Sequence, residues 1–256
     1  MADLSVSSVS KLAAALCGVA MLAVGGSASG AAMKDGHPDL SGFWAVTFEG
    51  NKPSGQALID ELPKGTIMIH DTGPGELKAG DYGGLKLSDR ALNEVKHYSY
   101  EDEITPENNC IGPSMAFLMQ APFPMEIFQG RDLIVLKMEY FDMVRVVFMD
   151  GRGHMPADAP HSKAGDSIGH WDGDTLVVDT DHLEPATFMN NGFNHSDKMH
   201  VIEKFRLSPD GKTLWITQLY DDPDTFEGLA ARYLSWRRMP GEHVYPYDCD
   251  PTYNND

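Results

Sequence analysis

From residue 125 onward, hydrophobic and polar residues alternate with a period of two, which is typical of β-strands that bury one face. Most of these segments are rich in Val, Ile, Leu and aromatic residues, and turn-forming residues separate them. The pattern predicts strands at residues 125–130, 132–140, 143–151, 167–171, 174–180, 200–207, 213–220 and 231–239.

The connections between these strands are short. Asp172-Gly173 is a two-residue hairpin signal, and Pro209-Asp210-Gly211 is a turn signal between two later strands. A meander with this many strands normally closes into a barrel or folds into a sandwich, so that few strand edges are left unpaired. The sequence therefore predicts an all-β fold, an antiparallel meander that closes into a barrel, and the resemblance of residues 42–44 to the Gly-x-Trp motif of lipocalin-like barrels makes a lipocalin-like barrel the expectation. Another antiparallel β fold is the alternative.

An earlier strand is expected at residues 40–48, where Gly42-Phe43-Trp44 resembles the Gly-x-Trp start of lipocalin-like barrels. In those barrels the Trp packs near an Arg of the last strand, a part that Arg237 or Arg238 could play here. Residues 49–107 are rich in Gly, Pro and charge, and we expect loops there with one short helix at residues 88–98. Ser88 is its expected N-cap.

The first 31 residues have the layout of a cleaved signal peptide. Lys11 precedes an apolar run at residues 12–24, and small residues follow it, with cleavage expected between Ala28 and Ala32. The run is too short to serve as a stable membrane anchor. We therefore expect a periplasmic or secreted protein of bacterial type, with a single β-barrel domain at residues 32–256.

Removal of the signal peptide leaves two cysteines, Cys110 and Cys249. In an oxidising compartment two such cysteines are expected to form a disulfide, which would fasten the C-terminal tail to the middle of the chain. Two free thiols or a catalytic cysteine are the alternatives.

One strand carries a carboxylate on its apolar face. Met199, Val201, Phe205 and Leu207 share a face of the predicted strand, and Glu203 lies among them. A carboxylate in apolar surroundings loses hydration unless it is paired, so such groups serve as acids or bases, or as partners of a buried cation.

Arg145 is the complementary case, because it shares a face with Met143, Val147 and Met149. A guanidinium in that position needs a carboxylate, either from the protein or from a ligand. Glu139 lies in the preceding strand, and a tight hairpin would bring it close to Arg145. The two alternatives are an internal Glu–Arg pair that braces the barrel wall and an arginine that faces a ligand.

His195 is the candidate proton shuttle, at the entrance to the strand that holds Glu203, with Asp197 as the group that would orient it. Three successive residues, His195-Ser196-Asp197, cannot form a catalytic triad, since the relay needs side chains that converge from separate segments. The alternative is a solvated loop.

The sequence predicts neither a cofactor nor a metal. It lacks a phosphate-binding glycine loop, the H-E-x-x-H spacing and a zinc-type cysteine pair. The chain holds 10 histidines, however, and a cupin-like set of ligands spread along several strands remains an alternative.

The chain has 20 Lys and Arg against 38 Asp and Glu, a net charge of −18. A strongly acidic protein is an unsuitable partner for nucleic acid or for an anionic membrane, which are polyanions. The charge therefore excludes these two kinds of partner and otherwise favours solubility; the expected partner is a small molecule that binds the barrel.

Several motifs resemble a large group of secreted bacterial proteins that are similar in outline to lipocalin-like barrels. The most specific is DSIGHWDGDTLVVDT, and the others begin at residues 38, 123, 139, 195 and 221. Members of that group often carry a His where this chain has Asp166. The motifs contain Arg152 and His154, which we add to Arg145 as candidate substrate-binding residues. The resemblance implies a periplasmic single domain with a Cys110–Cys249 bridge, and it supplies no reaction.

Two functions follow from these observations. The first is a periplasmic enzyme that carries out cofactor-free acid–base chemistry of the lyase type on a small, mostly apolar and aromatic carboxylate. In that hypothesis His195, Asp197 and Glu203 or Glu139 are catalytic, and Arg145 holds the substrate. The second is a periplasmic binding or carrier protein without catalysis.

Overall fold

The structure is a computed structural model that describes residues 31–49, 52–70, 78, 80–99, 101, 105, 108–189 and 192–252. The expected signal peptide lies outside these residues, apart from Ala31. Within the described part of the chain, no helix is long and apolar enough to cross a membrane.

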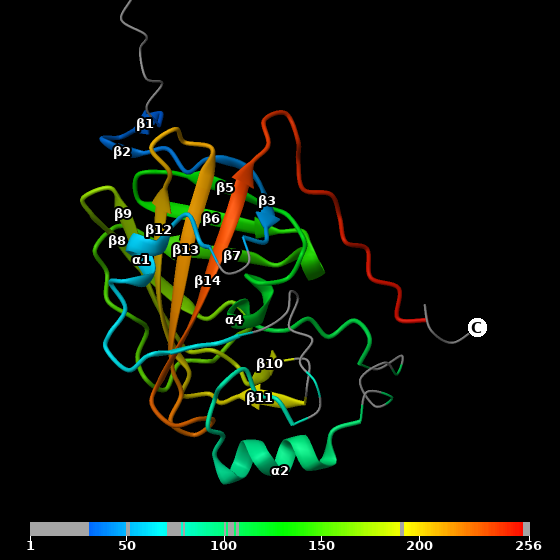
Figure 1. The fold of residues 1–256 in the computed structure, drawn as a ribbon. Helices are drawn as coiled ribbons and strands as arrows, with labels where there is room; N and C mark the ends of the chain where they lie inside the picture. Colours follow the sequence, from blue (N-terminus) through cyan, green and yellow to red (C-terminus); the bar gives the residue numbers. More distant parts are fainter. Residues whose placement is uncertain are drawn as a thin grey trace, which may run out of the picture.

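The prediction of a closed, mostly antiparallel β-barrel is confirmed (Figure 1). Nine strands form the barrel in the order β14–β3–β5–β6–β7–β8–β9–β12–β13, and β13 closes it by pairing with β14. Their bounds are β3 (Gly42–Thr47), β5 (Met125–Gln129), β6 (Leu133–Met138), β7 (Val144–Phe148), β8 (Asp166–Asp172), β9 (Thr175–Asp181), β12 (His200–Leu207), β13 (Thr213–Asp221) and β14 (Leu229–Arg238).

Two pairings depart from the antiparallel meander. β7 and β8 are joined by the long segment 149–165 and run parallel, with the last two residues of β7 paired with Ser167 and Ile168 near the start of β8. The two-residue strand β4 (Ile67–Met68) pairs in parallel with the first half of β14, whose second half pairs with β3. Because β14 is long, it can pair with β13 along one edge and with both β4 and β3 along the other.

The predicted turns lie where the sequence places them, with one shift. The hairpin between β8 and β9 turns at Gly173 and Asp174, one residue later than expected, because Asp172 still pairs with Thr175. Gly173 takes up a φ of +59°, which a residue with a side chain rarely adopts.

The expected Trp–Arg contact forms at the barrel's closing seam. The guanidinium of Arg238 lies 4.3 Å from the ring centroid of Trp44 and donates hydrogen bonds to the carbonyls of Ser41 (2.5 Å) and Asp39 (2.6 Å). The indole of Trp44 is fully buried and donates to the Leu40 carbonyl at 2.9 Å. Arg238 thus joins the last barrel strand to the first.

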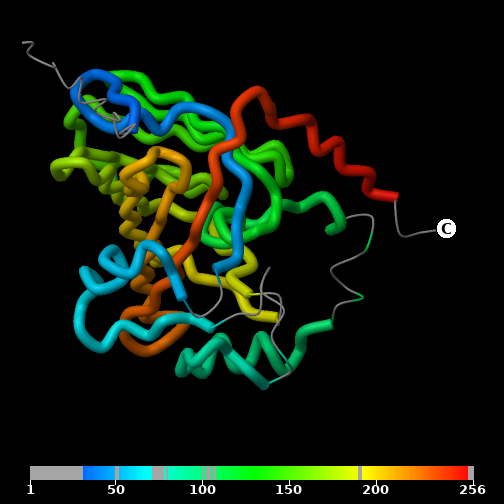
Figure 2. The backbone as a smooth tube through the Cα atoms, turned by 45° about the horizontal axis from the view of Figure 1, so that its top comes forward, coloured from blue at the N-terminus to red at the C-terminus, as the bar shows by residue number. Residues whose placement is uncertain are grey.

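Smaller elements cover one end of the barrel. The hairpin of β10 (Ala186–Met189) and β11 (Phe193–His195) and the helix α2 (Asp89–His97) lie beyond this end, and α4 (Met115–Leu118) lies between them and the barrel (Figures 1 and 2). All four residues of α4 are buried. Ser88 caps α2 as predicted, accepting a hydrogen bond from the Ala91 amide.

Three further short elements lie elsewhere in the described chain. The hairpin of β1 (Met33–Lys34) and β2 (His37–Pro38) precedes β3, and the helix α1 (Gln56–Ile59) contacts β13. The prediction of a single short helix was therefore incomplete, because α1 and α4 are too short to give a helical hydrophobic period.

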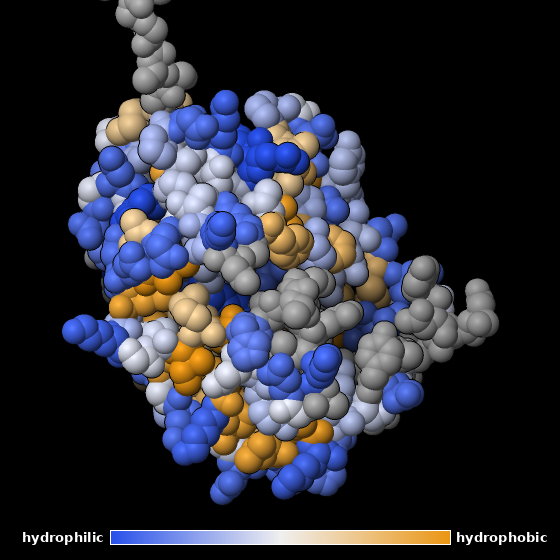
Figure 3. Space-filling view, in the orientation of Figure 1, coloured by the Kyte–Doolittle hydropathy of each residue, from blue (hydrophilic) through white to orange (hydrophobic). Residues whose placement is uncertain are grey.

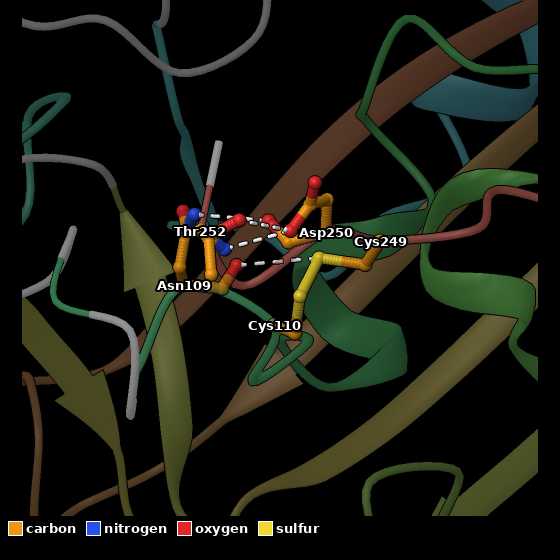
Figure 4. Close-up of a disulfide and its surroundings, with 5 residues drawn as sticks. All are labelled: Asn109, Cys110, Cys249, Asp250 and Thr252. Atoms are coloured by element: carbon orange, nitrogen blue, oxygen red, sulfur yellow. Dashed lines mark hydrogen bonds between the residues drawn. A yellow bond between two sulfur atoms is a disulfide. The ribbon is translucent and has the colours of Figure 1, made fainter. Parts of the chain in front are cut away.

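The predicted disulfide is confirmed. The sulfur atoms of Cys110 and Cys249 are bonded, and the bridge joins positions 139 residues apart (Figure 4). The C-terminal tail runs outside the barrel, as Figure 2 shows, and Tyr247 packs against the rings of Phe123, Tyr140 and Phe141. The bridge therefore secures a segment that has no strand partner.

The outer surface is mainly hydrophilic on the face shown in Figure 3, with separate hydrophobic patches in its lower half. This distribution agrees with the net charge of −18. The disulfide fits an extracellular, oxidising compartment.

Candidate functional site

A layer of buried polar side chains crosses the barrel interior. Glu203, Gln218 and Arg232 occupy matching positions on β12, β13 and β14. Arg145, Ser167 and Thr180 approach them from β7, β8 and β9. We call these six residues, together with Tyr220, the buried polar layer; each is at most 2% exposed.

Arg145 and Glu203 form the ion pair of this layer. Arg145 also donates to the hydroxyls of Ser167 (3.0 Å) and Thr180 (2.7 Å), while Glu203 accepts a bond from the Gln218 amide at 3.0 Å. Of the two alternatives for Arg145, the structure therefore contains the internal Glu–Arg pair.

The expected contact between Glu139 and Arg145 is wrong. Leu136, not Glu139, lies opposite Arg145 in the β6–β7 pairing. The chain after Met138 forms a turn of 3₁₀ type at Tyr140–Asp142, so Glu139 has left the strand before it could face Arg145. Its carboxylate instead accepts a hydrogen bond from the Tyr245 amide at 3.2 Å, on the tail.

The described interior also holds polar atoms without hydrogen bonds. Arg145 Nη1 and both polar side-chain atoms of Gln120 are buried and lack a partner among the described residues. Large buried side chains, including Trp44, Trp236 and Phe205, also belong to the core of the protein. The described interior therefore combines a packed core with some unused hydrogen-bonding capacity.

His195 makes a hydrogen bond that the sequence did not predict. Its Nε2 lies 2.6 Å from Ser114 Oγ, and both side chains are fully buried. Its Nδ1 lies 2.8 Å from the carbonyl oxygen of Ser196. A carbonyl can only accept, so Nδ1 carries the proton and Nε2 of the neutral ring accepts the hydroxyl proton of Ser114. This is the arrangement of a hydroxyl group with an adjacent general base.

The third member of this arrangement is Asp222. It is buried and accepts bonds from the Ser196 amide (2.7 Å) and hydroxyl (2.6 Å), so it holds the residue whose carbonyl orients His195. Asp197, expected in this role, is exposed, because the turn after Ser196 directs it away from the barrel. The expectation that Asp197 orients His195 was therefore wrong.

Burial sets the protonation of His195. It lowers the pKa of His195 below its ordinary value, and this effect outweighs the opposing influence of the Ser196 carbonyl and the Asp222 carboxylate. The positive charges of Lys163 and Arg90 also lower the pKa. The ring is therefore neutral at pH 7, the form in which it can accept a proton.

A pocket of about 420 Å³ lies beside the Ser114–His195 pair. Pro113, Asn194 and Ala186 line it; the first two are chain neighbours of the pair, and Ala186 is the strand partner of His195. Lys163 is the one cation among the described lining residues. The others are mainly aromatic, apolar and amide side chains: Asn108, Asn109, Ile111, Gly112, Phe117, Tyr140, Phe141, Pro185 and Thr187.

The two remaining candidates lie elsewhere. Arg152 is exposed and forms a two-pronged ion pair with Asp150, while its guanidinium covers the Phe148 ring at 3.9 Å. His154 contacts three aspartates on the outer wall of the barrel. The geometry thus keeps His195 as a candidate, and Lys163, not Arg145, is the cation that lines the pocket beside it.

Some of these buried polar residues could have been predicted from the sequence. Gln218 and Arg232 lie among apolar residues of the same face, the pattern that identified Glu203. Ser114, Lys163 and Asp222 lie in loops, where no periodicity indicates which way a side chain points. Only the folded chain brings them to His195.

Comparison with models of known protein families gives no match, and comparison with curated protein sequences gives none either. The resemblance to a group of secreted bacterial proteins therefore stays a prediction, and the function has to be argued from the site.

Proposed function

We propose that this chain is a periplasmic or secreted enzyme that carries out acid–base chemistry of the lyase type on a small aromatic carboxylate. The observation that carries this proposal is the hydrogen bond from Ser114 Oγ to His195 Nε2, made by a neutral imidazole whose other nitrogen is held by a backbone carbonyl. A base held in one tautomer and kept neutral by burial is prepared to take a proton at neutral pH.

The pocket supports the choice of substrate. Phe117, Tyr140 and Phe141 provide apolar, aromatic walls, and its size suits a small molecule. Lys163 supplies the positive charge that a carboxylate needs in such surroundings. An acidic surface would repel larger polyanions, so the pocket would select a small monoacid.

In the proposed reaction, Ser114 relays the proton. Neither the Ser114 nor the His195 side chain is exposed, so the reaction requires the residues in front of Ser114 to move aside when the ligand binds. The ligand then transfers a proton to Ser114 Oγ while the Ser114 hydroxyl proton passes to His195 Nε2. Lys163 stabilises the negative charge that develops on the ligand. Proton return from the imidazolium to the product or to the departing group restores the neutral pair. The chemistry fits an elimination, a decarboxylation or an isomerisation.

The test is a turnover screen with purified protein and a panel of aromatic acids that can undergo these reactions. We expect His195→Gln to lower turnover by roughly 10²–10⁴-fold, the usual contribution of a general base. Ser114→Ala should have a similar effect, and Lys163→Met should mainly raise KM. His97→Gln, on the exposed side of α2, is the matched control. Turnover that His195→Gln leaves unchanged would remove the base from the mechanism.

A carrier without catalysis is the second candidate, and one observation favours it. Ser114 and His195 have no exposed surface, so a ligand in the pocket meets the residues in front of them. Calorimetry with the same acids separates the two functions. Binding that depends on Lys163 but gives no product would support a carrier.

A further inference from the structure

The outer wall of the barrel carries a second group of titratable side chains, and none of its described contacts involves Ser114 or His195. Asp166 on β8 lies opposite Asp181 on β9 in the strand pairing. Their neighbours Ser167 and Thr180 point into the barrel, so both aspartates point outward. His154, from the segment between β7 and β8, lies against them.

The contacts of His154 are unusual for a histidine. Its Nδ1 lies 3.0 Å from Asp166 Oδ2 and 3.0 Å from Asp181 Oδ1, and its Nε2 lies 3.2 Å from Asp179 Oδ1. A neutral imidazole has one N–H, which cannot satisfy oxygens on both sides of the ring. Two of the three carboxylates also have a second histidine beside them: His182 contacts Asp181 at 2.7 Å, and His200 contacts Asp179 at 2.6 Å.

We propose that His154, Asp166 and Asp181 bind one divalent transition-metal ion. One donor atom from each residue lies within 4.8 Å of the others. Two ligand atoms at about 2.1 Å from an ion and at right angles to each other lie roughly 3.0 Å apart. That is the distance from His154 Nδ1 to each of the two carboxylate oxygens.

The surrounding contacts have the arrangement of the outer shell of a metal site. With Nδ1 on the ion, the single N–H of His154 is on Nε2 and donates to Asp179, the usual carboxylate–histidine–metal order. The Met155 amide donates to Asp166 at 2.9 Å, and His182 Nδ1 lies 2.7 Å from Asp181 Oδ1. Each proposed ligand is therefore fixed by a second group.

The donor set indicates the kind of ion. One imidazole nitrogen with two carboxylate oxygens suits ions such as Zn²⁺ or Mn²⁺, whereas Ca²⁺ and Mg²⁺ favour oxygen ligands alone. Asp166 is almost fully buried, and Asp181 is about one-third exposed, so the open side of the site would take water ligands.

The test is titration of EDTA-treated protein with Zn²⁺ by calorimetry, together with the visible absorption of bound Co²⁺. We expect one equivalent to bind the wild type. His154→Ala and Asp181→Asn should weaken binding by at least about 100-fold, and Asp179→Asn by roughly 10–100-fold. Asp166→His should retain binding, because an imidazole is also a ligand of these ions.

His243 supplies the matched control, because it also faces a carboxylate, with its Nδ1 3.3 Å from Glu126, but lacks further acidic partners in the described structure. His243→Ala should leave Zn²⁺ binding unchanged. Far-UV circular dichroism checks that each variant is folded, and the rise in wild-type Tm on adding Zn²⁺ gives a second measurement. A wild type without binding or Tm rise, or equal losses in His243→Ala and His154→Ala, would overturn the proposal.

Discussion

The guanidinium of Arg145 and the carboxylate of Glu203 meet inside the closed barrel, although 58 residues separate them in the sequence. Their side chains are 2% and 0% exposed, so neither charge is stabilised by bulk water. Ser167, Thr180 and Gln218 supply the hydrogen bonds that replace it. This pair explains why two charged residues occupy positions where the strand pattern calls for apolar ones.

Removal of one charge of this pair should destabilise the barrel strongly. Glu203→Gln leaves the Arg145 guanidinium buried without its counter-ion, and we expect the free energy of unfolding to fall by about 3–5 kcal/mol. Urea unfolding measures the change. The double variant Arg145→Met/Glu203→Leu should recover much of this loss, since it removes both charges from the core.

The exposed pair of Lys86 and Glu227 is the control for that experiment. Water solvates both of its charges, so Glu227→Gln should change stability by less than about 1 kcal/mol. A similar effect of Glu203→Gln and Glu227→Gln would show that the buried pair does not support the barrel.

Arg238 should contribute to closure of the barrel through its two carbonyl contacts. Arg238→Lys keeps the positive charge but cannot reach the Ser41 and Asp39 carbonyls while it covers Trp44, so we expect a loss of about 1–3 kcal/mol in urea unfolding. Arg237→Lys, at the exposed neighbouring position, should stay within about 0.5 kcal/mol of the wild type. Equal effects of the two variants would contradict the role of Arg238 at the seam.

Reduction of the disulfide should release the tail before it unfolds the barrel. Apart from Cys249, the tail is held by single hydrogen bonds, by the contact of His243 with Glu126, by the burial of Val244 and by the packing of Tyr247. We therefore expect proteolysis of the reduced protein to cut within residues 240–252, while the near-UV spectrum of the barrel persists. Tyr140 and Phe141 contact this tail and line the pocket, so reduction should also weaken ligand binding there.

The same cleavage in the oxidised protein would show that the bridge does not hold the tail. A Cys110→Ser/Cys249→Ser variant separates loss of the bridge from other effects of the reducing agent, and it should behave like the reduced wild type.

Protonation of His195 should lower the stability of the folded protein in mild acid. Burial lowers its pKa in the folded protein, whereas the unfolded chain takes up a proton near pH 6.5. The contribution of His195 is thus fully present above pH 6.5 and is lost as the pH falls towards its folded pKa. Urea midpoints between pH 7.5 and pH 5 should fall less steeply for His195→Gln than for the wild type. Parallel profiles of the two proteins would contradict this assignment.

Much of the fold followed from local sequence signals. Period-two alternation predicted the strands of the barrel after residue 125, because strand periodicity and turn residues act over a few neighbouring positions. The contact between Trp44 and an arginine of the last strand was instead predicted from the resemblance of Gly42-Phe43-Trp44 to the start of lipocalin-like barrels. The disulfide was predicted because two cysteines follow the expected signal peptide, and two cysteines allow only one pairing with each other; the structure confirms this pair.

The candidate site could be predicted only in part from the sequence. The sequence by itself determined that Glu203 and Arg145 would be buried charges and that His195 was a candidate base. Only the tertiary structure decided that Glu203, and not Glu139, pairs with Arg145, and that Ser114 meets His195 from a position 81 residues earlier. The reason is physical: the pattern along a strand fixes the face on which a side chain lies, but barrel closure and the paths of the loops fix which side chains it meets across the fold.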